Sequence, residues 1–375
     1  MNVIEPFVLD IAEDTLVDLA ERLDRTRWPE EETVEDWSQG TKLTALKELV
    51  AYWRIEYDWR RCEARLNSIG QFTTEIDGLS IHFLHRRSPR EGAIPLVITH
   101  GWPGSVVEFL GVIDELAEPA DPDQPAFHVV APSLPGYGFS GKPAGTGWGV
   151  ERIARAWAEL MQRLGYAGWV AQGGDWGAAV TTAIGQLAPE GCRGIHLNMP
   201  IGRPGPEDMH STDPKVQRAL LKLGFYRDWD SGYSKQQSTR PQTIGYSLVD
   251  SPVGLAAWVL EKVFYWTDND GSPWDALSMD QVLDDIMLYW LPATGASAAR
   301  LYWESFGSFG EGTVAIPAGA SAFPEEILPA PREWVERSLT NLVYWNELEK
   351  GGHFAAWEQP ELFVGELRSC FGQML

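Results

Sequence analysis

The sequence is poor in cysteine and in basic residues. Its three cysteines, Cys62, Cys192 and Cys370, are odd in number and widely spaced, which excludes a dense disulfide framework and a cysteine-based metal site and favours a reducing compartment. Lys and Arg number 30 against 53 Asp and Glu, so the net charge is −23. Because a field of this sign repels nucleic acid and anionic membranes, neither is an expected partner.

The start of the chain also lacks a targeting pattern. Residues 1–14 carry acidic side chains, with no basic stretch and no long apolar run. This pattern does not fit a signal peptide or a membrane anchor, so a cytoplasmic location is expected. With 375 residues, 44% of them hydrophobic, the chain can form a large globular core with insertions.

The most informative stretch is Ala171-Gln-Gly-Gly-Asp-Trp-Gly-Ala-Ala179, which lies between an apolar run and a helical pattern of small residues. A Gly-x-nucleophile-x-Gly turn between a strand and a helix lifts its central side chain above the sheet. Glycines are needed at Gly173 and Gly177, because a Cβ there would collide with the turn. A glycine-rich turn with a helix-capping Asp is the structural alternative.

The central residue of this turn is Asp175, where many enzymes carry serine. A serine needs a base before it can attack, whereas a carboxylate is already ionised at neutral pH and can attack carbon directly. Such a nucleophile suits displacement at an sp³ carbon that bears an epoxide oxygen or a halide. The product of that step is an alkyl ester.

The order of patterns along the chain predicts an α/β fold. Strand and helix patterns alternate over residues 71–200 and return over 313–375, which indicates a mostly parallel sheet flanked by helices. Residues 201–312 are rich in Trp, Tyr and Pro, without a convincing strand, and are interpreted as a helical cap. Residues 1–70 are interpreted as an N-terminal helical arm that packs on the core and has no strand.

Three local expectations follow from the same patterns. A helix should open at Thr41, as its N-cap, and continue to about Tyr57. A helix should also cover residues 106–113, and a strand should form at 314–316.

Two further motifs supply partners for Asp175. The stretch His100-Gly-Trp-Pro-Gly-Ser105 joins a predicted strand to a helix, so the backbone N–H groups of Trp102 and Trp176 could hold an oxyanion on the ester of Asp175. His100 itself is expected to be structural. Near the C-terminus, Gly351-Gly-His353 follows a late strand, where a histidine fits the role of base in the order nucleophile, acid, histidine.

Taken together, these motifs resemble the epoxide hydrolases of the α/β-hydrolase superfamily, of the microsomal and juvenile-hormone type. The resemblance spans nearly the whole chain and suggests a soluble bacterial member, since the membrane-anchoring segment of animal members is missing. The matching segments are His100–Ser105, Gly173–Gly177, Ser231–Tyr233, Thr239–Pro241, Asp250–Ala257, Phe323–Glu326 and Gly351–Ala356.

The resemblance implies roles for individual residues. Asp175 would be the nucleophile and His353 the base, oriented by Glu326 of the Phe-Pro-x-Glu sequence. The residues alone do not separate Glu326 from Glu325. Two cap tyrosines would protonate the epoxide oxygen, and these are Tyr233 and Tyr302.

The expected reaction converts an apolar epoxide, aromatic ones included, to a vicinal diol through an ester on Asp175. The partners are then the epoxide and water, with no cofactor and no metal; a homo-oligomer is not indicated. One alternative is a haloalkane dehalogenase with the same Asp nucleophile. Another, of a different class, is a catalytically silent protein that uses the α/β-hydrolase fold for binding.

Overall fold

A nine-stranded sheet forms the centre of the computed structural model, which describes residues 3–375. The strand order is β1-β2-β3-β5-β4-β6-β7-β8-β9; the first three pairings are antiparallel and the other five are parallel. The sheet is therefore mostly parallel, as predicted. The strands are β1 (Ile4–Phe7), β2 (Gln71–Ile76), β3 (Leu79–Arg86), β4 (Ile94–Thr99), β5 (Phe127–Pro132), β6 (Trp169–Gly173), β7 (Cys192–Leu197), β8 (Ala318–Ala322) and β9 (Leu342–Glu347).

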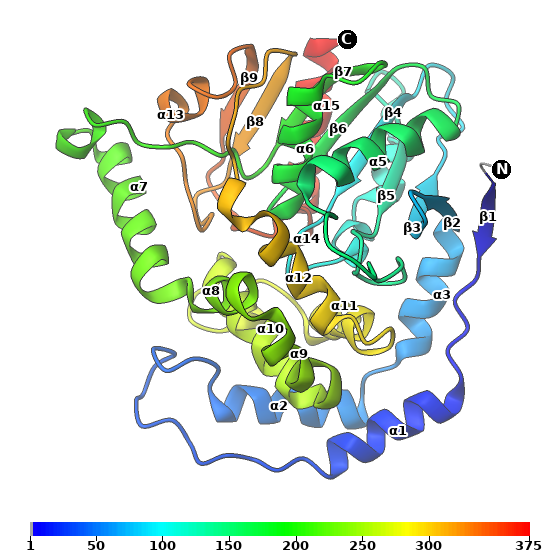
Figure 1. The fold of residues 1–375 in the computed structure, drawn as a ribbon, viewed down its shortest axis with the longest axis vertical. Helices are drawn as coiled ribbons and strands as arrows, with labels where there is room; N and C mark the ends of the chain where they lie inside the picture. Colours follow the sequence, from blue (N-terminus) through cyan, green and yellow to red (C-terminus); the bar gives the residue numbers. More distant parts are fainter. Residues whose placement is uncertain (1–2) are drawn as a thin grey trace.

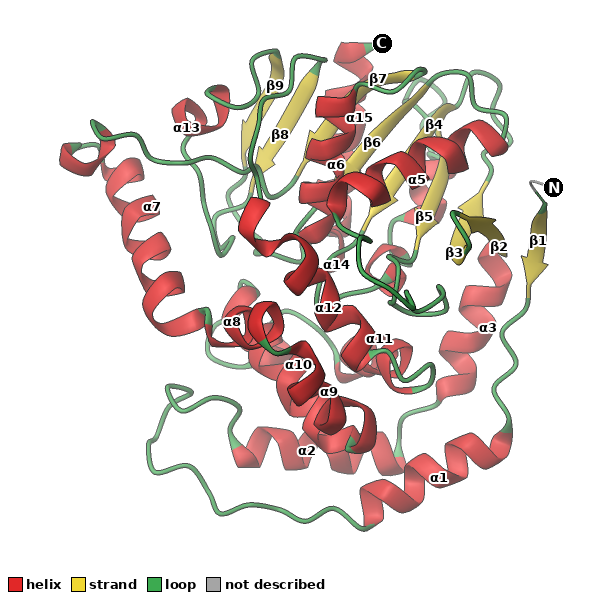
Figure 2. Ribbon diagram, in the orientation of Figure 1, coloured by secondary structure: helices red, strands yellow, loops and turns green. Residues whose placement is uncertain are grey.

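Helices cover both faces of this sheet and complete the predicted α/β architecture. Figure 2 shows α5 and α6 in front of the sheet and α15 behind it. Strands β4 to β8 are largely apolar and buried because helices shield them on both sides, whereas the edge strand β9 has no buried residue. The helices of this layer are α4 (Ile113–Ala117), α5 (Val150–Arg163), α6 (Trp176–Leu187), α13 (Arg332–Glu336), α14 (Ala355–Glu358) and α15 (Pro360–Met374).

A group of helices between β7 and β8 lies over one end of the sheet (Figure 1). Residues 201–312 contain no strand. Local signals set the helix starts: Ser278 and Gln281 form a capping box, and Ser251 caps a helix that begins with Pro252. The helices are α7 (Pro214–Phe225), α8 (Gly232–Thr239), α9 (Pro241–Asp250), α10 (Pro252–Trp266), α11 (Met279–Trp290) and α12 (Gly295–Ser305), with a π-helical turn at Tyr226–Asp230 and 3₁₀ turns at Asp208–His210, Pro273–Asp275 and Phe306–Ser308.

None of the helices described in residues 3–375 is by itself long and apolar enough to cross a membrane. The pair α9 and α10 reaches the required length and apolarity together, but it is bent by 115°.

The N-terminal arm contributes to both the sheet and the cap. The expectation that it has no strand is wrong, because β1 pairs with β2 at the sheet edge, with Ile4 opposite Thr74. Four residues with one proline give too weak a local signal, and the pairing partner lies about 70 residues away. The helices α1 (Glu13–Asp24), α2 (Leu43–Ile55) and α3 (Trp59–Ile69) pack on cap helices α10 and α11.

The expected helix from Thr41 to Tyr57 is also corrected. Helix α2 begins at Leu43, since the Thr41 hydroxyl donates to the carbonyl of Ala257 instead of capping its own helix. The chain then bends, and Asp58 caps the start of α3 by accepting from Arg60.

Two more local expectations are wrong. Residues 106–113 form a 3₁₀ turn at Val106–Phe109 and then α4, with Gly111, a poor helix former, between them. The strand expected at 314–316 is β8 at Ala318–Ala322, and Val314 makes only an isolated bridge to Leu339. Strand β8 consists of small residues because the packing beside it leaves little room: a Cβ on Gly319 would collide with Cys370.

Candidate active site

The strand-to-helix turn holds Asp175 in a strained conformation above the end of β6. Its φ is 50° and its ψ is −126°, values that L-residues rarely adopt. A Cβ on Gly173 would strike the carbonyl of Gly177, and one on Gly177 would strike the carbonyl of Thr99. Both glycines are therefore required, as the sequence predicts.

One backbone N–H contacts the carboxylate of Asp175, and a second lies next to it in the chain. Its Oδ1 accepts a hydrogen bond of 2.7 Å from the N–H of Trp102. The N–H of Trp176 lies in the first turn of α6, where donors have no acceptor within the helix and the helix dipole favours a negative charge. These are the two N–H groups expected to stabilise an oxyanion, and the one from Trp102 contacts the carboxylate directly.

His353 connects Asp175 to Glu326. The His353 Nε2 lies 3.5 Å from Asp175 Oδ2, and its Nδ1 lies 2.7 Å from Glu326 Oε1. Both His353 and Glu326 are buried. The structure separates the two adjacent acids, because Glu325 points outward to ion pairs with Arg218 and Lys222.

The carboxylates control the charge of this histidine. Burial alone would lower the pKa of His353, but Glu326 and Asp175 outweigh it and hold the pKa well above its ordinary value. The imidazolium is thus favoured as long as both carboxylates are ionised. Any reaction that neutralises Asp175 would remove part of this support.

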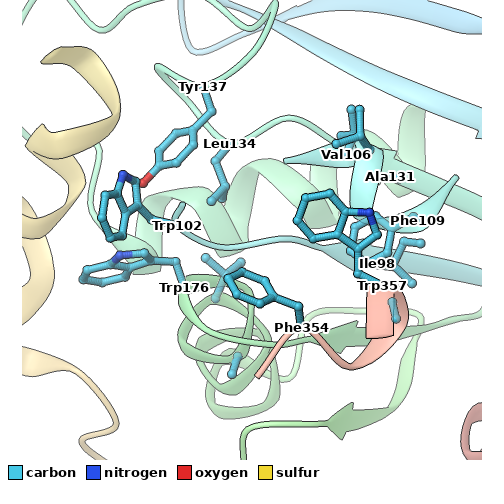
Figure 3. Packing of buried hydrophobic residues seen from close by; sticks show 14 of the residues in the cluster. Ile98, Trp102, Val106, Phe109, Ala131, Leu134, Tyr137, Trp176, Phe354 and Trp357 are labelled. Carbon is cyan, nitrogen blue, oxygen red and sulfur yellow. The ribbon is translucent and has the colours of Figure 1, made fainter. Parts of the chain in front are cut away.

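The two cap tyrosines lie against the loop and the turn. The ring of Tyr233 stacks on Trp102 at 4.8 Å, and the ring of Tyr302 meets Trp176 edge-on at 4.8 Å. Figure 3 shows these two tryptophans next to each other among the buried residues. Tyr233 and Tyr302 come from α8 and α12, far apart in the sequence, yet their ring centroids are 5.7 Å apart.

Both phenols remain protonated at neutral pH. Burial raises the pKa of Tyr233 and of Tyr302 well above 10, and the negative charge of Asp175 adds to the shift. The Tyr233 hydroxyl lies 3.2 Å from that of Tyr226. The buried hydroxyl of Tyr302 donates to no residue in the described part of the chain, so its proton is available to a ligand.

A small cavity lies beside Asp175 and His353. The volume available to the centre of a water molecule is about 20 Å³. Since about 10–15 Å³ of such volume is enough for one water molecule, the cavity can hold at least one. Polar groups reach it from several elements, including the carboxylate of Glu108 and the amide of Asn198. Its other lining residues are Thr99, His100, Gly101, Trp102, Phe109, Gly174, Phe354, Ala355, Ala356 and Phe363.

Sequence reasoning missed some residues of this site. Tyr226 contacts Tyr233, Glu108 lines the cavity, and Trp266 packs on the His353 ring at 5.0 Å while its carbonyl accepts the His353 N–H. Glu108 could have been noticed as an acid among apolar residues; nothing local marks Tyr226 or Trp266. The expectation for His100 is confirmed, since its ring bonds to the backbone of Gly101 and Leu134.

Within residues 3–375, no group of three His, Cys, Asp or Glu side chains could hold a metal ion. The three cysteines are unpaired.

The sheet order, the Asp-bearing turn and the His–Glu pair define an α/β-hydrolase, and residues 94–244 match the family described as alpha/beta hydrolase fold. Residues 4–109 match the family described as epoxide hydrolase N terminus.

Comparisons of the whole chain with related proteins show which family of α/β-hydrolases it resembles. A Stigmatella aurantiaca protein named "putative epoxide hydrolase" is 56% identical over 377 residues, 99% of this chain and 85% of the relative. Juvenile hormone epoxide hydrolase from Bombyx mori superposes with a TM-score of 0.92 at 31% identity, covering 100% of this chain and 95% of that one. An Aspergillus niger epoxide hydrolase gives a TM-score of 0.91 at 35% identity, with 100% and 97% covered. The chain belongs to the epoxide hydrolase family, and the resemblance inferred from its motifs is confirmed.

Proposed function

We propose that this enzyme hydrolyses an apolar epoxide to a vicinal diol through a covalent ester on Asp175. The observation that carries the proposal is the position of that carboxylate, which has the His353–Glu326 pair on one side and a pair of buried phenols nearby. Each group has a task in an epoxide hydrolysis that needs no cofactor.

In the first step, Asp175 Oδ2 attacks an epoxide carbon and the carbon–oxygen bond of the ring breaks. Oδ1 is held by Trp102, which leaves Oδ2 as the attacking atom. The departing oxygen takes a proton from Tyr233 or Tyr302, because an alkoxide is far more basic than a phenolate. The result is a hydroxyalkyl ester.

In the second step, neutral His353 takes a proton from water as the water oxygen attacks the ester carbonyl. The bond from that carbon to the alkyl oxygen then breaks, and the leaving alkoxide takes the proton from His353, which gives the diol and restores the Asp175 carboxylate. Ester formation removes the charge of Asp175, and with it one of the groups that raise the pKa of His353. The pKa of the imidazole therefore falls at the stage when it must accept a proton from water. The cavity beside His353 can hold that water, and the N–H groups of Trp102 and Trp176 would stabilise the oxyanion.

The surroundings favour an apolar substrate. Aromatic rings of Trp102, Trp176 and Trp266 enclose the phenols. An apolar pocket lies next to the turn, and its residue Phe309 meets the Trp176 ring edge-on at 5.0 Å. An epoxide with an alkyl or aryl substituent would be desolvated here at little cost.

A single turnover in heavy-oxygen water tests the covalent step. The first diol should carry unlabelled oxygen, because the oxygen that enters it comes from Asp175. Immediate full labelling would mean that water attacks the epoxide directly and would refute the ester.

Substrate panels distinguish the alternatives. We expect turnover of styrene oxide, and loss of turnover when both cap tyrosines are replaced by phenylalanine. A haloalkane dehalogenase would tolerate the double change, since a halide needs no proton to leave. A binding protein would show no turnover of any epoxide in a broad panel.

A further inference from the structure

Lys262 is a charged side chain in the interior of the cap. It lies on α10 with only 1% of its surface exposed, between apolar stretches of the helix. Its ammonium pairs with Asp230 Oδ1 at 2.8 Å and with Glu261 Oε1 at 2.7 Å. Burying such a pair costs desolvation energy that apolar residues of the same size would avoid, so stability alone does not explain it.

Asp230 fixes the position of this ammonium. Its Oδ2 accepts a hydrogen bond of 2.7 Å from the indole N–H of Trp266, so both carboxylate oxygens have partners. Asp230 ends the π-helical turn that directly precedes α8, the helix that carries Tyr233. Such turns often occur at functional sites.

The ammonium also lies against the aromatic rings of the site. Lys262 Nζ lies over the ring of Tyr233, 4.6 Å from its centroid, and over that of Trp266 at 5.4 Å. The Tyr233 ring is thereby in contact with both a buried cation and the stacked indole of Trp102. A cation over an aromatic face is attracted to it, and the attraction grows when the ring gains negative charge.

We propose that Lys262, held by Asp230, is a positioning residue that speeds epoxide opening by stabilising the negative charge that develops on Tyr233. The inference rests on the proposed function and extends it. As the Asp175–carbon bond forms and the epoxide carbon–oxygen bond breaks, the Tyr233 proton passes to the departing oxygen. The phenolate left behind is balanced by the ammonium until solvent returns the proton.

Pre-steady-state kinetics of Lys262→Met test this role. Ester formation and ester hydrolysis can be followed separately by tryptophan fluorescence in single turnovers, since Trp102 and Trp176 border the reacting groups. We expect ester formation to slow by at least about tenfold, the order of a desolvated cation–π contact, and ester hydrolysis to keep its rate. Lys235→Met is the matched control, because Lys235 is exposed on α8 and should leave both rates unchanged.

Two further variants guard against a structural effect. Lys262→Met leaves Asp230 without its counter-ion, so Lys262→Met with Asp230→Asn removes both charges of the buried Lys262–Asp230 pair and keeps the partly exposed Glu261. This double variant should show the same slow ester formation in a stably folded protein. In the Tyr233→Phe background, Lys262→Met should change ester formation less than about twofold, since the group through which it acts is gone.

The outcomes are distinct. An equal effect of Lys262→Met in the Tyr233 and Tyr233→Phe backgrounds, equal slowing of both steps, or no slowing would overturn the inference while leaving the ester mechanism standing. If Tyr233→Phe itself leaves ester formation unchanged, the assignment of Tyr233 under the proposed function fails, and the inference fails with it.

Discussion

Glu326→Gln offers the sharpest test of the second half-reaction. The Glu326 carboxylate bonds to His353 Nδ1 at 2.7 Å and is only 2% exposed, so solvent cannot replace it. Gln keeps the size of the side chain but removes its charge. The imidazolium that forms when His353 takes a proton from water then loses its main support.

The magnitude follows from the contact. A hydrogen bond to a charged group contributes about 1.5–3 kcal/mol, so ester hydrolysis should slow by about 10- to 150-fold. Ester formation needs no proton transfer by His353 and should change far less. The ester should therefore accumulate in the variant.

Stopped-flow tryptophan fluorescence measures the two steps, and mass spectrometry of the quenched enzyme detects the ester on Asp175. Glu325→Gln is the control, since Glu325 is the adjacent acid, with ion pairs to Arg218 and Lys222, and should behave as wild type. Equal effects of the two variants, or a slowed first step with a normal second one, would refute the reasoning.

Three other outcomes are expected. Tyr302→Phe should slow ester formation about 10- to 150-fold, because the departing oxygen loses a phenol hydrogen bond worth about 1.5–3 kcal/mol, with the ester hydrolysis rate kept as the internal check. Gly177→Ala should lose about 3 kcal/mol in urea denaturation because its Cβ would strike the Thr99 carbonyl, whereas Gly224→Ala, with open space at its Cβ on α7, should lose nothing. The folded-state pKa of His353 is raised, so its stabilising contribution is complete below about pH 6.5 and disappears as the pH rises through that raised pKa. The difference in Tm between wild type and His353→Gln should thus be larger at about pH 6 than at about pH 10, and the opposite trend would contradict the sign.

The sequence predicts the parts of the site that depend on local geometry. The Gly173–Gly177 turn is determined by residues next to each other in the chain, so the local pattern is enough to predict it. Strand β8 could not be predicted in this way, since Ala-Gly-Ala-Ser-Ala has no side chain that favours a strand. It forms because it pairs with its neighbours β7 and β9 in the sheet.

Long-range contacts account for most of what pattern reasoning misses. Residue chemistry alone could not distinguish Glu326 from Glu325, because the choice depends on which side chain faces His353 in the folded chain. The same is true of Lys262, whose place in an apolar helix is visible in the sequence but whose contact with Tyr233 is not. The roles of Asp175, His353 and the cap tyrosines remain predictions for kinetics to test.

The N-terminal arm bears on how the enzyme can move. Its strand β1 is hydrogen-bonded to the sheet that carries Asp175, while Arg61 and Tyr57 bond to Asp284 of the cap helix α11. The N-terminal arm is thus bonded both to the sheet and to the cap, the two parts of the protein that enclose the active site. Swinging the cap helices away from the sheet would break at least one of these attachments, so we expect ligands to enter and leave through smaller motions of side chains and loops.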